Sequence, residues 1–230
     1  MSSQTGTRLT GSVAEYRLCQ DGTQQSPIAL GLNQGLSQVH HPYFDGYTRN
    51  VTGNYYNWGY GPAFTLDHPK DVYTGLPSMR FDDTTLYLRG WHLHAPSDHI
   101  VADDRSKSEL HMVHVNAKGE EGAVLAIRLD PGASPAPFFS QLPPMIGFND
   151  TRQITGVEIN PRLALQGVNE FSEFWTYRGS LTSPPCKEGI RWFVARSILF
   201  TSVDQMREIL SVSTYSARIL QEVWLHQINA

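Results

Sequence analysis

Four stretches of this chain have the residue pattern of β-strands, and they constrain the fold more than any other feature. They are rich in β-branched and aromatic residues and partly alternate between apolar and polar side chains, as strands do. Turn signals lie between them, and no internal repeat or low-complexity linker divides the chain. The four stretches are 84–94 (TTLYLRGWHLH), 109–117 (ELHMVHVNA), 122–129 (GAVLAIRL) and 190–199 (IRWFVARSIL).

Signals for helices are few. Ser202, followed by Gln205, makes a capping box that predicts the start of one helix. FFSQL at 138–142 lies between proline clusters and predicts a short helical turn. The polar residues 1–15 predict a flexible leader, which leaves 16–230 as one domain. We therefore expect a mainly β, single-domain fold whose strands are mostly antiparallel, with a few short peripheral helices.

The composition excludes several classes of function. Of the 230 residues, 40% are hydrophobic and 17% are charged, which suffices for a sizeable core and argues against disorder. The formal net charge of −4 comes without basic clusters or long runs of one sign. We therefore expect no nucleic-acid partner and no membrane association. No stretch approaches the roughly 20 apolar residues of a membrane-spanning helix.

Histidines recur at alternate positions in two of the strand-like stretches. Alternate residues of a strand point to one face, so His92 and His94 direct their imidazoles to a common spot. His111 is a third imidazole, with Glu109 two residues before it on the same side. Histidines that bind metals usually give their second ring N–H to a carboxylate or a carbonyl, and Glu109 is placed to be that acceptor. His114 points the other way, and we expect it to be a hydrogen-bonded core histidine.

Three imidazoles from neighbouring strands would leave one coordination position of a metal ion open. Zinc with three protein ligands and a water is the catalytic arrangement, whereas structural sites close with four protein ligands. An alternative uses the spacing H-x-H-x₃-D, in which His92, His94 and Asp98 would be ligands of a cupin-like enzyme using iron or manganese. Cupins are double-sheet jelly rolls that add a second Gly/Pro-framed motif with one more histidine, and we do not find that motif.

Two cysteines, Cys19 and Cys186, bear on the compartment. Two buried thiols are typical of an intracellular protein, and a disulfide is typical of an extracellular one. Asn50 and Asn149 begin the N-glycosylation sequons NVT and NDT, both in polar neighbourhoods. The sequons and the even number of cysteines together favour a secreted glycoprotein. The first residues have no signal-peptide pattern, which leaves this question open.

Five short motifs, taken in their order along the chain, resemble the α-class carbonic anhydrases. That family pairs an H-x-H strand with an E-x-H strand and carries an early Q-S-P-I and a later Y-R-G-S-L-T-T/S-P-P segment. Each motif is weak alone, but here all five stand in the family's order and span most of the chain, from about Cys19 to Trp192. The five motifs are QQSPI (24–28), HLH (92–94), PSDH (96–99), ELHMVH (109–114) and YRGSLTSPP (177–185).

The resemblance implies an α-carbonic-anhydrase-like catalytic domain at 16–230, built on a large, twisted, mostly antiparallel central sheet. It implies a zinc enzyme, a lyase that reversibly hydrates carbon dioxide to bicarbonate and a proton by means of a zinc-bound hydroxide. Thr182 matches a residue that accepts a hydrogen bond from the hydroxide and donates to a buried carboxylate, here Asp98. Glu109 would support a zinc ligand. The zinc ligands implied are His92, His94 and His111.

The same resemblance assigns the substrate pocket and the cysteines. Ser183 matches a polar position beside the zinc water, and Cys19 and Cys186 match the disulfide of the family's secreted members. A cis Ser183–Pro184 bond would fit the tight turn there. The apolar residues that match the lining of the CO₂ pocket are Val113, Val124, Leu181, Ile190 and Trp192.

Three positions depart from the family. Asp98 stands where a glutamate is usual and is one methylene shorter, so either the backbone shifts or the hydrogen bond from Thr182 lengthens. Gly90 stands where many members have a glutamine that supports the first histidine, so His92 needs another partner. Pro62 falls at the place of the proton-shuttle histidine, and proline cannot titrate.

Three functional hypotheses follow from the sequence. The first is a secreted zinc carbonic anhydrase whose partners are CO₂, bicarbonate and water, with a homodimer as the expected assembly. The second is a cupin-like iron or manganese oxygenase or isomerase. The third is a non-enzymatic binding module that keeps the fold without the chemistry; loss of a zinc histidine would favour it, but all three are present.

Overall fold

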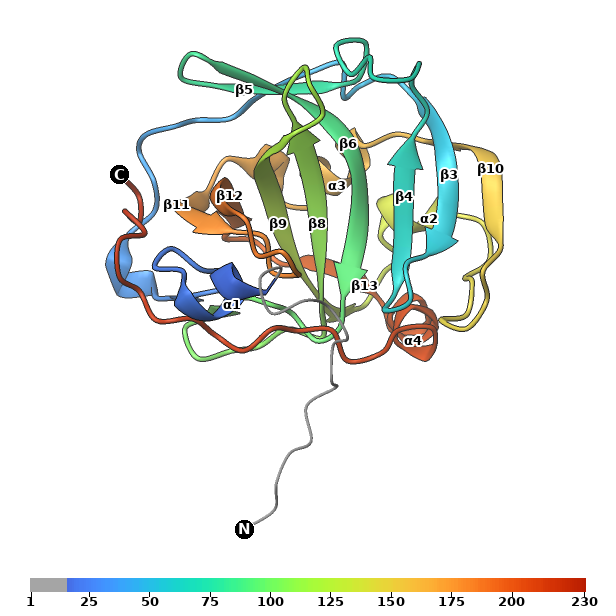
Figure 1. The fold of residues 1–230 in the computed structure, drawn as a ribbon. Coiled ribbons are helices and arrows are strands. Elements are labelled where there is room, and N and C mark those ends of the chain that lie inside the picture. The colour runs from blue at the N-terminus through green and yellow to red at the C-terminus, as the bar shows by residue number, and fades with distance from the viewer. Residues whose placement is uncertain (1–15) are drawn as a thin grey trace.

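The computed structural model describes residues 16–230, so the leader predicted for residues 1–15 lies outside the described residues. Its centre is a twisted sheet of 11 strands (Figure 1). The strand order along its main path is β10-β3-β4-β6-β8-β9-β12-β11, while β13 pairs with β9 and β5 joins β2 to β6. The strands are β2 (Tyr43–Asp45), β3 (Val51–Asn57), β4 (Pro62–Leu66), β5 (Ser78–Phe81), β6 (Thr84–His94), β8 (Ser108–Val115), β9 (Glu121–Gly132), β10 (Gln153–Ile159), β11 (Phe174–Ser180), β12 (Glu188–Ala195) and β13 (Leu199–Ser202).

Most pairings in this sheet are antiparallel, as predicted, and two parallel pairings make it mixed. β12 pairs in parallel with the first half of β9, and β13 pairs in parallel with the second half. The stretch predicted as one strand at 190–199 is therefore two strands that share the same neighbour. A separate two-stranded parallel sheet joins β1 (Ala29–Leu30) to β7 (Ile100–Val101).

The helices are short and peripheral. The predicted capping box begins α4, where the Ser202 side chain accepts from the Gln205 backbone N–H at 3.1 Å and the Gln205 side chain accepts from the Ser202 backbone N–H at 3.3 Å. None of the helices within residues 16–230 is long and apolar enough to cross a membrane. The helices are α1 (Arg17–Asp21), α2 (Pro137–Ser140), α3 (Arg162–Gln166) and α4 (Val203–Ser211), with 3₁₀ turns η1 (Leu32–Gln34) and η2 (Asn169–Phe171).

The two faces of the sheet carry different cores because alternate residues of each strand point to opposite faces. On β8, Leu110 and Met112 belong to the larger cluster, which also includes Phe138 of α2. His111 and Val113 alternate with them and therefore lie on the other face. That face carries the smaller cluster, to which Trp192 of β12 belongs. The candidate site lies on this second face.

Candidate metal centre

The antiparallel pairing of β6 with β8 brings the three predicted histidines together. In this register His92 lies opposite His111, and His94 lies opposite Glu109. The ligand nitrogens of the three histidines all lie within 4.8 Å of one another, and the Nε2 atoms of His92 and His94 are 3.2 Å apart. Alternation on β6 together with direct pairing across to β8 therefore accounts for the cluster.

Hydrogen bonds fix the orientation of two of the three rings. Nε2 of His111 lies 2.8 Å from Oε1 of Glu109, which leaves Nδ1 of this ring free for a metal ion. Nδ1 of His94 lies 3.1 Å from the carbonyl oxygen of Ser216, which leaves Nε2 free. Each acceptor takes the N–H of the ring nitrogen that faces it. The other nitrogen of the ring then keeps its lone pair for a metal ion.

Burial favours the neutral, metal-binding form of His92 and His94. Burial lowers the pKa of His92 well below its ordinary value, and the imidazoles of His94 and His111 lower it further. Burial also lowers the pKa of His94. Metal ligands must be deprotonated, so the lowered pKa values of His92 and His94 and the convergence of the three rings fit a metal ion. Among residues 16–230, only histidines belong to this cluster, which leaves a fourth coordination position for water.

Glu109 lies in a fully buried network. Its carboxylate accepts from Ser97 Oγ at 2.5 Å, from the His99 backbone N–H at 2.8 Å, from His99 Nδ1 at 2.6 Å and from His111 Nε2. Burial opposes the charge on Glu109, but His99 and the hydrogen bonds from both rings outweigh it and hold the pKa of this carboxyl well below its ordinary value. Glu109 is therefore an ionised, fixed acceptor for the ring of His111.

Sequence reasoning gave no role to several members of this network. Nε2 of His99 lies 2.8 Å from the Tyr177 hydroxyl, which lies 2.9 Å from Ser26 Oγ. His99 and Ser26 both stand in motifs quoted above, PSDH and QQSPI, so the signal was present without a role attached. Ser216 has no such signal, because its contact with His94 spans 122 positions of the chain.

Asp98 lies beside the cluster and makes no hydrogen bond with Thr182. Asp98 is fully buried, and its Oδ1 accepts from the Arg218 backbone N–H at 2.8 Å. Its Oδ2 lies 3.7 Å from Nε2 of His94 and has no hydrogen-bond partner among residues 16–230. The bond from the half-buried Thr182 is thus not formed. A buried acceptor oxygen therefore stays unpaired beside the histidine cluster.

A cavity of about 250 Å³ opens beside His92. Its apolar lining includes Val113 and Leu181, and Ser183 contributes a hydroxyl. Val113 pairs with Val124 across β8 and β9, and Val124 pairs with Trp192 across β9 and β12. The five residues predicted for a CO₂ pocket, Val113, Val124, Leu181, Ile190 and Trp192, all belong to or pack against the smaller core cluster.

The cavity does not include a shuttle histidine. Within residues 16–230, His92 is the only histidine among the lining residues. Pro62 is buried at the start of β4. The predicted core histidine, His114, is buried on the opposite face, where its Nδ1 lies 3.0 Å from the carbonyl oxygen of Met112 and its Nε2 lies 2.5 Å from the Tyr47 hydroxyl.

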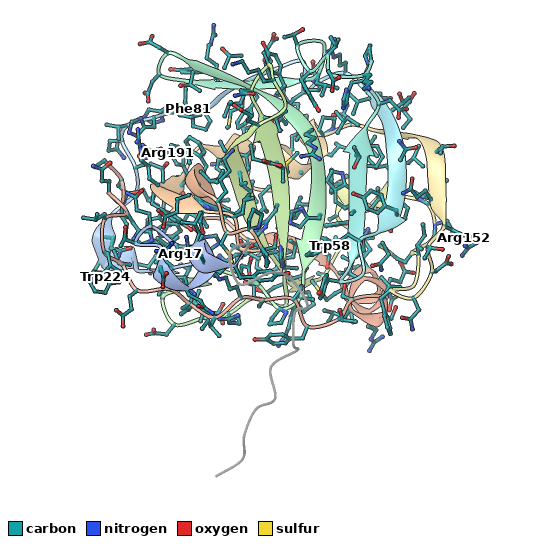
Figure 2. All side chains as sticks on the ribbon, viewed as in Figure 1. Arg17, Trp58, Phe81, Arg152, Arg191 and Trp224 are labelled. Carbon is teal, nitrogen blue, oxygen red and sulfur yellow. A yellow bond between two sulfur atoms is a disulfide. The ribbon has the colours of Figure 1, made fainter. Side chains whose placement is uncertain are left out.

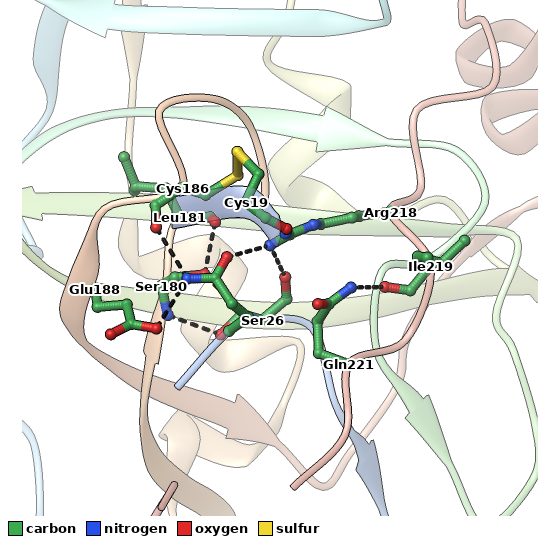
Figure 3. The surroundings of a disulfide bond; sticks show 10 residues. Cys19, Ser26, Ser180, Leu181, Cys186, Glu188, Arg218, Ile219 and Gln221 are labelled. Atoms are coloured by element: carbon green, nitrogen blue, oxygen red, sulfur yellow. Dashed lines mark hydrogen bonds between the residues drawn. A yellow bond between two sulfur atoms is a disulfide. The ribbon is translucent and has the colours of Figure 1, made fainter. Parts of the chain in front are cut away.

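The structure contains a disulfide between Cys19 of α1 and Cys186, with the two Cα atoms 5.1 Å apart. Figure 3 shows the Arg218 side chain beside this bridge. Its guanidinium donates to the carbonyl oxygens of Cys19 at 2.9 Å and Ser26 at 2.7 Å. Since the backbone N–H of Arg218 binds Asp98, this arginine links the disulfide to the candidate site.

One local prediction was wrong by a residue. The cis bond expected at Ser183–Pro184 is instead Pro184–Pro185, and two further cis bonds are Ser26–Pro27 and Ala95–Pro96. The local pattern S-P-P predicts a cis proline in this turn without distinguishing its two proline bonds.

Comparisons with known proteins agree with this architecture. The sequence pattern of the eukaryotic-type carbonic anhydrases matches residues 12–224. Alpha carbonic anhydrase 4 of Arabidopsis thaliana is 30% identical over 83% of this chain and 67% of its own length. The carbonic anhydrase of Klebsiella pneumoniae is 28% identical over 84% of this chain and 73% of its own length. The solved α-carbonic anhydrase of Photobacterium profundum is 25% identical, covers 93% of this chain and 92% of its own, and superimposes with a TM-score of 0.77. This chain belongs to the eukaryotic-type, or α-class, carbonic anhydrase family.

Proposed function

We propose that this enzyme reversibly hydrates carbon dioxide to bicarbonate and a proton at a zinc ion held by His92, His94 and His111. One observation carries the proposal: three imidazoles converge, and one of them, that of His92, lines a cavity that has an apolar side. Three nitrogen ligands with an open fourth position suit zinc. Bound zinc supplies hydroxide near neutral pH, because it lowers the pKa of a water to about 7 in this enzyme family.

A cupin-like iron or manganese centre has less support. Such oxygenase sites use two histidines and a carboxylate as ligands. Asp98 is not a member of the cluster whose ligand atoms lie within 4.8 Å of one another, and its Oδ1 is already engaged by Arg218. The carboxylate therefore serves better as a hydrogen-bond acceptor beside the metal than as a ligand.

The chain's own residues divide the remaining work. The apolar wall formed by Val113 and Leu181 holds CO₂, because an apolar substrate displaces water from such a surface. Glu109 holds the His111 ring and keeps its lone pair directed at the metal. We assign to Thr182 the orientation of the nucleophile. In this chain Thr182 acts without a hydrogen bond to Asp98, whose Oδ2 has no partner among residues 16–230.

Metal analysis combined with a CO₂-hydration assay tests the proposal. We expect one zinc ion per chain and rapid hydration in the purified protein. His94→Ala should lose both, because it removes one of three ligands. His41→Ala, which removes an exposed histidine outside the ligand set, serves as the control and should keep both. Full zinc occupancy in His94→Ala, or hydration by a protein free of zinc, would contradict the assignment.

Secretion, glycosylation and a homodimer belong to the same proposal. The disulfide supports an oxidising compartment. Asn149 lies exposed in a turn, whereas the amide of Asn50 already donates to Glu158 at 2.7 Å, so Asn149 is the better acceptor. Mass spectrometry of the protein from its native source should find a glycan on Asn149, and light scattering should give the mass of two chains. An unmodified Asn149 or a single-chain mass would refute the respective point.

A further inference from the structure

The three histidines differ in how their rings are held. The second nitrogen of His94 faces the carbonyl of Ser216, and that of His111 faces Glu109. For His92, the one hydrogen-bond contact within residues 16–230 is between its Nε2 and Nε2 of His94. Both of these atoms are metal-facing. Among the described residues, no hydrogen bond on the far side of the ring orients His92.

The backbone explains why no neighbouring side chain on β6 does so. Two residues before His92, on the same face, the chain has Gly90. Strand β4 passes so close at this point that a Cβ on Gly90 would collide with the carbonyl oxygen of Phe64. With the backbone of this chain, a side chain at position 90 would collide with β4. Support for His92 has to come from another element.

Trp58 is the residue that contacts the ring. It follows β3, and Figure 2 shows it where the ends of β4 and β6 meet. Its ring centroid lies 5.1 Å from that of His92 and 5.2 Å from that of His94, with the ring planes inclined by 60° and 69°. These are edge-to-face contacts of the kind that favour one ring orientation. Trp58 therefore touches two of the three metal-site imidazoles.

A hydrogen bond fixes the indole on the same strand. Nε1–H of Trp58 donates to the carbonyl oxygen of Leu93, the residue between the two histidines, at 3.2 Å. The β4–β6 register pairs Ala63 with His92 and, one step further, sets Pro62 opposite Leu93. Proline has no N–H to donate across the strand pair. The indole of Trp58 supplies the donor that position 62 lacks.

We propose that Trp58 is a positioning residue of the metal centre, which holds the imidazoles of His92 and His94 in the orientation that binds the metal ion. Ring contact with both histidines and the hydrogen bond to Leu93 act together. This role deepens the proposed zinc site and rests on it. Residues that orient metal-binding histidines typically change metal affinity about 10- to 100-fold when they are replaced.

Zinc affinity, measured by competition with a chelator on the full chain, tests the role of Trp58. Trp58→Ala should weaken zinc binding at least about tenfold. Trp58→Phe keeps a ring and removes the hydrogen bond, so its loss should be smaller. The matched control is Trp175→Phe, because Trp175 is fully buried and its Nε1 has no partner among the described residues. This control should keep the zinc affinity of the unmodified chain.

Two further readouts separate positioning from general stability. The absorption spectrum of the cobalt(II)-loaded protein reports ligand geometry, and it should change in Trp58→Ala and not in Trp175→Phe. In the Trp58→Phe background, Pro62→Ala restores a backbone N–H opposite Leu93 and should recover part of the lost affinity. A change in melting temperature alone, with neither of these effects, would be the result of a purely structural role.

The outcomes distinguish this inference from the function on which it rests. If the unmodified chain binds no zinc, the proposed metal centre is wrong. If the unmodified chain binds zinc tightly and Trp58→Ala stays within twofold of it with the same cobalt spectrum, only the role of Trp58 is overturned. Should Trp58→Ala fail to fold, Trp58→Phe decides the matter: an affinity equal to that of the unmodified chain overturns the role.

Discussion

Two clusters of potential metal ligands lie side by side in this protein and share one histidine, but their hydrogen bonds differ. The open cluster is His92, His94 and His111; the closed cluster is His99, Glu109 and His111. In each, the potential ligand atoms lie within 4.8 Å of one another. In the closed cluster, His99 and His111 both direct a ring nitrogen at the same carboxylate oxygen. In the open cluster, the inward nitrogens of His94 and His111 carry lone pairs.

The difference shows that proximity and burial do not by themselves identify a metal site. What distinguishes the open cluster is that the hydrogen bonds of its rings point outward, to Ser216 and Glu109, so that acceptor atoms converge. The closed cluster uses its N–H groups to neutralise one buried carboxylate. His111 belongs to both, so the closed cluster orients one ligand of the open cluster.

The largest expected effect comes from Glu109→Gln, which breaks the link between the clusters. A glutamine amide can donate to Nε2 of His111, which would move the ring proton to Nδ1 and block the metal. Zinc affinity should fall about 10- to 100-fold, measured by chelator competition.

His99→Gln is the control for that change, because it alters the closed cluster without removing the acceptor for His111. It should lower the free energy of unfolding by about 1–3 kcal/mol, since a buried hydrogen-bonding group loses its partner. Zinc affinity should stay within about threefold. If instead His99→Gln and Glu109→Gln weaken zinc binding equally, the distinction between the clusters is wrong.

Local pattern was sufficient to predict the histidine pairs, and the reason is geometric. The stretch predicted at 84–94 coincides with β6, and the period of two places His92 and His94 on one face. The predicted acceptor Glu109 lies 2.8 Å from His111 because both are on the same strand two residues apart. Such contacts depend on strand geometry alone.

The local sequence pattern could not predict contacts that depend on the order of the strands and on the course of distant segments. The support of His94 by Ser216 and the contact of Trp58 with His92 depend on how distant segments return to the ends of β6. The parallel pairing of β12 and β13 with β9 was likewise not predicted. The shorter side chain of Asp98 predicted either a backbone shift or a longer bond from Thr182, and only the structure shows that this bond is not formed.

His114, a buried histidine outside both clusters, extends the comparison to pH. Burial lowers the pKa of His114 to about 3, although its backbone hydrogen bond to Met112 opposes this. The unfolded chain takes up this proton near pH 6.5. Between these values the unfolded state binds more protons, so stability is lost as the pH falls from about 6.5 toward 3. At pH 5 this loss amounts to about 2 kcal/mol.

Urea unfolding at pH 7.5 and pH 5 measures that loss. His114→Gln keeps groups able to hydrogen-bond Tyr47 and Met112 but cannot titrate. Between the two pH values, its free energy of unfolding should therefore fall by about 2 kcal/mol less than that of the unmodified protein. Parallel pH profiles for the two proteins would mean that His114 is not the group responsible.

Asp98→Glu tests the role of Asp98 Oδ2, an acceptor beside the open cluster that has no partner among residues 16–230. The added methylene should bring a carboxylate oxygen within reach of the Thr182 hydroxyl. A hydrogen bond to a charged group contributes about 1.5–3 kcal/mol, and crowding of the core by the added methylene offsets part of this gain. We therefore expect kcat/KM to rise up to about tenfold. A double-mutant cycle with Thr182→Ala should show coupling in the glutamate background and little in the native one. Equal coupling in both backgrounds would show that Asp98 already contacts Thr182 during turnover.

The smallest expected effect concerns the proton that each turnover must export. A relay group works best when its pKa lies near the working pH, and within residues 16–230 the cavity contains no histidine besides the metal-site His92. We therefore expect kcat to rise with the concentration of an imidazole buffer while kcat/KM stays nearly constant, since CO₂ conversion precedes proton export. Pro62→His and Thr65→His each introduce a histidine as a proton relay. Thr65 lines the cavity, whereas Pro62 is buried. Either should raise kcat several-fold at low buffer, with Thr65→His the larger. A native kcat that is high and indifferent to buffer would show that another group of the chain already carries the proton.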